Sequence, residues 1–181
     1  MVASGMIRDD HLKRLTAGRW LLPLLAHLEA EQGSRFAAML GRLGLSRSAL
    51  AASLVQLQAE GWIRRNPGHG HPLRPEYVLT RAGEPIAAFA ARVMAQRERL
   101  GLEPAQLPRW SLPIVGRLSG QRARFSALRV ALPPVTPRAL SLTLKQMLST
   151  DLVDRALADE FPPIAIYGLT GRGERLAEAM R

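Results

Sequence analysis

The sequence feature that most constrains the fold is an internal repeat with an offset of 90 residues. The segment RWLLPLL, which begins at Arg19, recurs as RWSLPIV, which begins at Arg109. At the same offset LSRSALAASLVQLQAEGWIRR lies over VTPRALSLTLKQMLSTDLVDR, and YVLTRAGE lies over YGLTGRGE. Chance similarity between Leu- and Ala-rich helices would not keep Trp, Pro, Tyr, Thr and Gly aligned across three separated blocks. The chain is therefore predicted to be a duplication of one domain.

A small shift in the repeat locates one insertion, and the remaining sequence gives the domain limits. The pairs Arg35-Phe36 and Arg124-Phe125 differ by 89 residues, which predicts a single inserted residue before Val135. We predict copy one over residues 9–99, a linker over 100–108 and a diverged copy two over 109–181. The linker LGLEPAQLP holds two Pro and one Gly. A copy of about 80 residues can still bury a modest core.

Helical periodicity and capping residues predict a helix-turn-helix in copy one. Asp9 or Asp10 is expected to cap a short helix that ends near Gly18, and a second helix starts at Arg19 or Trp20. Pro23 then falls in the first turn of that helix, as Pro113 does in copy two. A short helix over residues 35–43 and a Gly-Leu turn precede a helix capped by Ser46. The core face of this last helix carries Leu50, Leu54 and Leu57.

The segment after the helix-turn-helix predicts a wing. Gly61 is expected to end the helix in a left-handed turn. Residues 62–65 and 76–79 read as two short strands around the loop NPGHGHPLRP, and a last helix covers 86–99. The predicted fold is mainly α with small β-hairpin wings (α+β). It is a tandem winged helix-turn-helix, and the two copies would form a pseudo-dimer within one chain.

These motifs resemble the HxlR family of bacterial winged-helix regulators. The resemblance is carried by RW followed by an apolar helix, the RF pair, SRSALAASLVQLQAEGWIRR and the closing Y-V-L-T-x-x-G. It covers nearly all of copy one and most of copy two, which departs from the pattern with Asp151 in place of Gly61. The resemblance implies relatives that are homodimers on palindromic operators, so that a fused pair would resemble a dimer.

The net charge of the chain indicates the class of molecule that it binds. The chain has 25 Lys and Arg against 15 Asp and Glu, a net charge of +10, and most of the cations are Arg. A basic surface of this kind suits a polyanion, and a helix-turn-helix makes double-stranded DNA the expected partner. A generally basic surface from an Arg-rich coding bias is the alternative, and charge alone does not separate the two.

The predicted DNA-binding residues lie on the second helix of each helix-turn-helix and on the first wing. They are Ser46, Arg47, Ser48, Arg64, Arg65, His69, His71, Arg74, Thr136, Arg138, Ser141 and Lys145. For each single Arg, a solvated surface charge is the competing interpretation. The copies differ, because Ala51, Ala52 and Val55 face outward in copy one and can read little beyond a thymine methyl group. The second wing carries Asp154, Asp159 and Glu160, and we expect DNA to repel it.

Several function classes find no support in the sequence. The chain has no Cys, which excludes disulfides and thiolate zinc sites and fits a reducing compartment. A Gly-rich phosphate loop, a nucleophile elbow and a paired-carboxylate motif are all missing, so no enzyme activity and no cofactor are predicted. His69 and His71 suggest a metal site only weakly. We expect Trp20, Trp62 and Trp110 to pack in cores or interfaces. The predicted location is the cytoplasm, on the nucleoid, with no membrane partner.

Two functions remain. The first is a transcriptional regulator that binds an imperfect inverted repeat through both units, with half-sites about one helical turn apart. The second is a winged-helix module for protein–protein interaction, with weak or no specific DNA binding. A small-molecule effector is open: an apolar space lined by Trp20, Trp110 and residues 89–94 would hold one, and a packed interface is the alternative. The chain would act as a monomeric pseudo-dimer or a homodimer.

Overall fold

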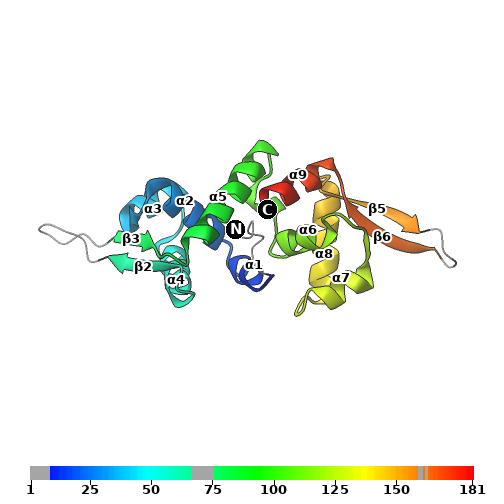
Figure 1. Ribbon diagram of the computed structural model, residues 1–181, viewed down its shortest axis with the longest axis horizontal. Helices are drawn as coiled ribbons and strands as arrows, with labels where there is room; N and C mark the ends of the chain where they lie inside the picture. The colour runs from blue at the N-terminus through cyan, green and yellow to red at the C-terminus, as the bar shows by residue number, and fades with distance from the viewer. Residues whose placement is uncertain (1–8, 67–75, 159–160, 162) are drawn as a thin grey trace, which may run out of the picture. The chain divides into compact units, whose positions relative to one another are not determined.

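The computed structural model describes residues 9–66, 76–158, 161 and 163–181. The chain divides into two compact units (Figure 1). We call Ala17–Met94 the first-copy unit, and we call Ala95–Arg181 together with the N-terminal residues up to Thr16 the second-copy unit. Each unit contains one set of the repeated elements, and each is described by itself below.

The first-copy unit is a winged helix-turn-helix. Its elements are α2 (Leu21–Glu31), β1 (Ser34–Arg35), α3 (Phe36–Leu43), α4 (Arg47–Ala59), β2 (Ile63–Asn66), β3 (Glu76–Leu79) and the larger part of α5 (Glu84–Arg99). The three strands form an antiparallel sheet in the order β1-β3-β2, with Ile63 opposite Leu79 in the hairpin. This hairpin is the predicted wing, and it projects from the helices in Figure 1.

Local sequence explains why α4 lies where it does. The Ser46 hydroxyl accepts a hydrogen bond from the Ala49 backbone N–H at 3.2 Å, as an N-cap does. Gly44 takes a left-handed φ of 62° at the end of α3, which lets the chain turn within three residues. The predicted inward leucines of α4 are buried, with Leu50 and Leu57 fully enclosed. The predicted helix-turn-helix of copy one is confirmed.

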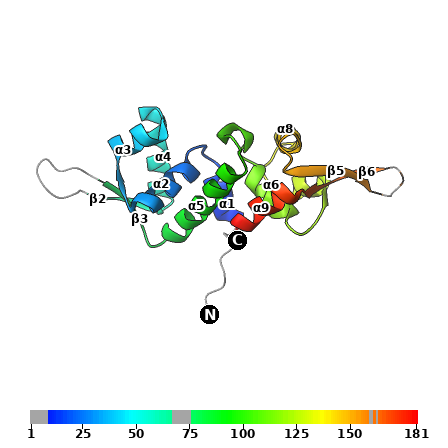
Figure 2. The same ribbon diagram turned by 90° about the horizontal axis from the view of Figure 1, so that it is seen from above.

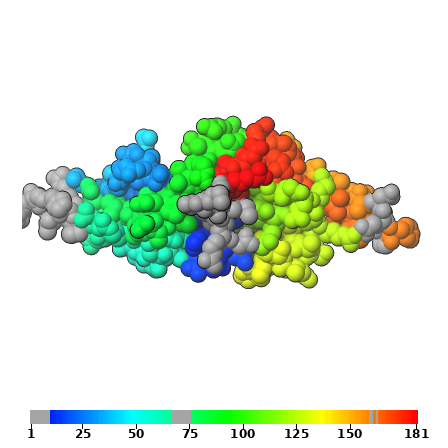
Figure 3. All heavy atoms as spheres, in the orientation of Figure 1, coloured from blue at the N-terminus to red at the C-terminus, as the bar shows by residue number. Residues whose placement is uncertain are grey.

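The second-copy unit repeats this order. Its elements are α1 (Asp9–Leu15), the end of α5, the 3-10 turn Pro104–Gln106, α6 (Ser111–Leu118), β4 (Ala123–Arg124), α7 (Phe125–Ala131), α8 (Pro137–Ser149), β5 (Val153–Ala158), β6 (Ile164–Leu169) and α9 (Gly171–Ala179). The sheet order is β4-β6-β5, again antiparallel. Figures 2 and 3 show the β5–β6 hairpin projecting from the helices of its unit.

Helix α1 groups with the second copy although it precedes the first in the chain. It packs on α6, where Leu12 lies within 4.0 Å of the place that a Cβ on Gly116 would occupy. Leu12 and Leu15 are both buried. The compact units thus follow contacts and not the order of the repeat, and α1 ends at Leu15. The domain limits at residues 99 and 109 stay a prediction.

The inserted residue of copy two lies in its helix-turn-helix turn. α3 and α7 begin at Phe36 and Phe125, 89 residues apart, whereas α4 and α8 begin at Arg47 and Pro137, 90 residues apart. The turn covers residues 44–46 in copy one and 132–136 in copy two, where α7 is also one residue shorter than α3. α8 nevertheless starts with an equivalent cap, because the Thr136 hydroxyl accepts from the Ala139 N–H at 3.2 Å.

The repeated RW pair directly precedes α2 in the first-copy unit and α6 in the second-copy unit. The Arg19 guanidinium lies 4.9 Å from the centre of the Trp20 ring, and Arg109 lies 5.2 Å from that of Trp110. Both distances suit a cation–π contact. Trp110 is buried, and so is Trp62 at the base of the first wing, as predicted for a core role, whereas Trp20 is half-buried.

The T-x-x-G motif fastens the first wing to the helix that follows it. The Thr80 hydroxyl donates to the Gly61 carbonyl at 2.6 Å and accepts from the Gly83 N–H at 3.1 Å, while the Thr80 N–H donates to the Trp62 carbonyl. A Cβ on Gly83 would lie 1.9 Å from the Trp62 carbonyl oxygen. The motif therefore needs the hydroxyl of Thr80 and also needs a residue without a side chain at Gly83.

The second copy keeps this arrangement with one change. Thr170 donates to the Asp151 carbonyl, accepts from the Gly173 N–H, and through its own N–H bonds the Leu152 carbonyl. Asp151 replaces Gly61 and still adopts a left-handed φ of 54°, close to the 71° of Gly61. Asp tolerates this conformation better than most residues, so the helix end and wing root keep their form.

None of the described helices is both long and apolar enough to cross a bilayer.

Candidate nucleic-acid interface

The outward face of α4 is small and mostly apolar. Arg47 and Ser48 are exposed at its N-terminal end, and Ala51, Ala52 and Val55 are exposed after them. This is the outward set predicted from the sequence. Ser48 and Val55 are seven residues apart, which is about two helical turns, so they lie on the same side of α4. Val55 has a relative exposure of 66%, which is high for a valine.

The outward face of α8 is cationic in the same register. Arg138, Ser141 and Lys145 are exposed, as is Leu142 at 59%. With the offset of 90, Arg138 lies over Ser48 and Lys145 lies over Val55. The residue of copy two that is equivalent to Arg47 is Pro137. The two helices therefore differ in charge at two equivalent positions, whereas Ala52 and its equivalent Leu142 are both apolar.

Two of the predicted DNA-binding hydroxyls also cap helices. Ser46 and Thr136 each accept a backbone N–H at the start of α4 or α8. Ser46 Oγ additionally lies 3.2 Å from Ser48 Oγ. A hydroxyl that accepts for a cap can still donate its one proton, so each of these residues could donate to a phosphate oxygen at the helix N-terminus.

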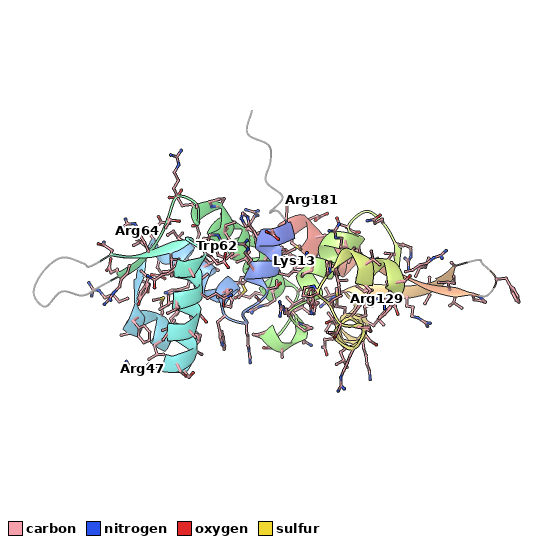
Figure 4. All side chains as sticks on the ribbon, turned by 90° about the horizontal axis from the view of Figure 1, so that it is seen from below. Lys13, Arg47, Trp62, Arg64, Arg129 and Arg181 are labelled. Carbon is pink, nitrogen blue, oxygen red and sulfur yellow. The ribbon has the colours of Figure 1, made fainter. Side chains whose placement is uncertain are left out.

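Arg47 is held at the N-terminal end of α4 by the neighbouring helix. Its guanidinium carbon lies 5.7 Å from the centre of the ring of Phe36, the first residue of α3. Stacking on an aromatic face orients a guanidinium and leaves its outward N–H groups available to a phosphate or a guanine edge. Figure 4 shows Arg47 at one end of α4 and Arg64 on β2 beyond the other end.

The root of the first wing is basic. Arg64 and Arg65 are consecutive and exposed on β2, opposite Val78 and Tyr77 of β3. The other predicted wing residues, His69, His71 and Arg74, lie outside the described residues. The suggested histidine metal site lies there too, and the part of the chain that the structure describes holds no cluster of three or more potential metal ligands.

In the second wing, an ion pair occupies the position of Arg64. Asp154 takes that place, and Arg122 binds it with Nη1 and Nη2 at 3.2 and 2.5 Å from the two carboxylate oxygens. The predicted negative charge of this wing is thus compensated at its root, because the guanidinium of Arg122 neutralises the carboxylate of Asp154. Asp159 and Glu160 lie outside the described residues.

A glycine exchange makes room for this pair. Arg122 precedes β4 as Gly33 precedes β1, and Gly168 on β6 corresponds to Val78 on β3. A Cβ on Gly33 would lie 2.9 Å from Val78 Cγ1, and a Cβ on Gly168 would lie 2.6 Å from Arg122 Nη1. Each copy thus has one glycine that leaves room for a side chain across the sheet. Gly33 leaves room for Val78 in copy one, and Gly168 leaves room for Arg122 in copy two.

We expect the Arg122–Asp154 pair to contribute modestly to stability. A double-mutant cycle with Arg122→Ala and Asp154→Ala should give a coupling of about 0.5–1 kcal/mol, because the pair is bidentate but exposed. The coupling should fall as salt rises. The single-contact pair Arg14–Asp10, at 3.4 Å on α1, is the matched control and should couple less strongly. Equal coupling in both cycles, measured by thermal unfolding, would show that the bidentate geometry adds nothing.

The distribution of acidic residues along the sequence gives a further signal. Residues 32–59 and 104–150 contain no Asp or Glu, although both segments contain several cations. These two segments hold the complete helix-turn-helix of each copy. Arg42 on α3 and Arg129 on α7 belong to them and are exposed, yet neither was among the predicted DNA-binding residues. Counting acids along the chain would have found them.

Comparison with known proteins agrees with this architecture. The family described as HxlR-like helix-turn-helix matches residues 15–101 and again residues 107–181. A relative from Methanothermobacter thermautotrophicus, named as an uncharacterized HTH-type transcriptional regulator, is 32% identical over 66 residues, which are 36% of this chain and 50% of that protein. YvaP of Bacillus subtilis has the same description and is 38% identical over 69 residues, which are 38% of this chain and 64% of that protein.

The chain thus spans about half to two thirds of the length of these relatives, which are named as regulators and not as enzymes. Among solved structures, a transcriptional regulator of the MarR family from Enterococcus faecalis V583 is similar with a TM-score of 0.40 and 27% identity, over 49% of this chain and 74% of that one.

Proposed function

This chain belongs to the HxlR-like helix-turn-helix family, and on that premise we propose that it is a DNA-binding transcriptional regulator that uses both of its winged units. The observation that carries the proposal is the presence of two exposed recognition helices, α4 and α8, each inside an acid-free segment and each followed by a hairpin. A helix in this position enters the major groove in helix-turn-helix proteins, while the cations around it bind phosphates.

The proposal includes an imperfect inverted repeat as the binding site. One chain supplies two recognition helices, which suits two half-sites, and the unequal side chains of α4 and α8 suit half-sites of unequal sequence. The chain would then bind as a monomeric pseudo-dimer or as a homodimer, in the cytoplasm and on the nucleoid. An effector, if one acts, would change the affinity for this site.

A binding titration on duplex DNA from the region upstream of the protein's own gene tests the proposal. We expect affinity that exceeds that for a scrambled duplex by at least about a thousandfold, and a linear fall of log affinity with log salt. Equal, salt-sensitive affinity for every duplex in the region would reduce the function to nonspecific binding. No binding at low salt would contradict it.

One observation favours a second candidate, a protein-docking role for copy two. Of the large hydrophobic side chains that are exposed among the described residues, five of six belong to the second-copy unit. They are Val130, Leu142, Leu148, Leu157 and Phe161. Exposed apolar side chains suit a protein partner better than a phosphate backbone where they lie together in one patch. A variant with Val130→Ser and Leu148→Ser that keeps full DNA affinity but loses transcriptional control would support this candidate.

A further inference from the structure

The middle of the α4 face offers methyl groups where a recognition helix ordinarily offers hydrogen-bonding groups. Ala51 and Val55 are one turn apart and both exposed, with Ala52 beside them. None of the three has a polar side-chain atom. Exposing 66% of a valine leaves apolar surface in water, which is unfavourable by about 25 cal/mol per Å². The face therefore suits an apolar surface on whatever it contacts.

The fold itself does not require an apolar residue at this place. In the second copy, the residue equivalent to Val55 is Lys145 and the one equivalent to Ser48 is Arg138, on a helix of the same length with the same buried face. Two copies of one domain thus tolerate opposite chemistry here. The fold therefore does not explain the apolar side chains at the middle of α4, and we attribute them to the surface that this helix contacts.

The surroundings of the face restrict the contact to a polyanion. Arg47 lies at one end of α4 and Arg64 lies on the wing beyond the other end (Figure 4), and Glu60 at the C-cap of α4 is the one acid in the sequence between them. An apolar protein surface gains nothing from these cations, whereas duplex DNA places phosphates on both sides of its major groove. The apolar group that base edges present in that groove is the C5-methyl of thymine.

We infer that α4 recognises thymine by its methyl group, through Ala51 and Val55, and that α8 contacts its half-site through Arg138 and Lys145. This inference rests on the proposed function and adds the chemistry of each half-site to it. The half-site of copy one is then rich in thymine at the contacted steps. That of copy two is defined by guanine edges or by phosphates, which cations bind.

Deoxyuridine substitution tests the inference, because uracil differs from thymine by that methyl alone. Each thymine of a bound duplex is replaced in turn and the affinity of the full chain is measured. Replacing a thymine under α4 should weaken binding about fourfold, which is the transfer free energy of one buried methyl expressed as a ratio. In Val55→Ala the same replacement should cost less, and in Lys145→Ala it should cost as much as in the unchanged protein.

The outcomes of this experiment distinguish a failure of thymine recognition by α4 from a failure of the proposed regulator function. Specific binding that tolerates deoxyuridine at every thymine would overturn methyl reading by α4 and leave the regulator proposal intact. A methyl effect that persists unchanged in Val55→Ala would overturn the assignment to this residue. Lys145→Ala should also lower the slope of log affinity against log salt by about one unit, whereas Val55→Ala should leave it unchanged. No preference among duplexes would overturn both statements together.

Discussion

Replacing Gly83 by alanine is expected to lower the free energy of unfolding of the first-copy unit by about 3 kcal/mol or more. The added Cβ would lie 1.9 Å from the Trp62 carbonyl oxygen, and this neighbour is backbone that cannot rotate aside. Relief requires that α5 and the wing root separate. The separation breaks the hydrogen bonds of Thr80 with Trp62 and Gly83, and a backbone carbonyl is left unpaired.

The repeat supplies both a parallel and a control for this prediction. Gly173→Ala should have a similar effect on the second-copy unit, since its Cβ would lie 2.1 Å from the Leu152 carbonyl oxygen. Gly41→Ala, in the exposed interior of α3, meets nothing within 4 Å and should stabilise by about 0.5–1 kcal/mol. Chemical denaturation of the full chain measures all three. A loss for Gly83→Ala no larger than about 1 kcal/mol would mean that the close approach is not structural.

A charge reversal in the middle of either recognition helix should reduce DNA affinity by at least about a hundredfold, which corresponds to about 3 kcal/mol. Val55→Glu and Lys145→Glu each place a carboxylate against phosphates or base acceptors if both helices enter grooves. Because both positions are exposed and helical, the folded protein should tolerate either change. Fluorescence anisotropy on one duplex gives the two affinities.

Arg175→Glu is the matched control for this pair. It makes the same or a larger change in net charge on the exposed side of α9, outside the proposed interface, and should weaken binding less than about tenfold. The comparison with Lys145→Glu removes the effect of net charge. A normal affinity in Lys145→Glu would show that α8 does not contact DNA, and a normal affinity in Val55→Glu would show the same for α4.

Local rules predicted most of the fold because they act within a few residues. The cap at Ser46, the inward leucines of α4 and the left-handed turn at Gly61 all follow from spacing and residue type, and all three are present. The repeat added more, because one copy predicted the other. It also showed that one inserted residue had to lie before Val135, which is where the longer turn is found.

Features that depend on distant residues could not be predicted. The strands β1 and β4 have two residues each, too few for any alternation to show, and they pair with strands more than 40 residues later. The pairing of Arg122 with Asp154 spans 32 residues and depends on the space above Gly168. The sequence alone therefore made the second wing look more acidic than its root is. Likewise, no local pattern shows that α1 packs with α6.

The outward residues of the candidate site could be predicted from the sequence. Spacing identified the outward residues of α4 and α8, because the buried face of an amphipathic helix determines its exposed face. The offset of 90 residues then shows which positions are equivalent, with Arg138 over Ser48 and Lys145 over Val55. Val55 of α4 is thus replaced by a cation in α8, and the proposal of unequal half-sites rests on this difference.

Selection of bound sequences from a random duplex library tests the central claim most directly. The account predicts one motif with two inverted half-sites about one helical turn apart, unequal in sequence, with thymines in one of them. Repeating the selection with Lys145→Glu should remove the preference in the other half-site. A single half-site that is unchanged in Lys145→Glu, or no enriched motif at all, would contradict the claim that both units read one DNA site.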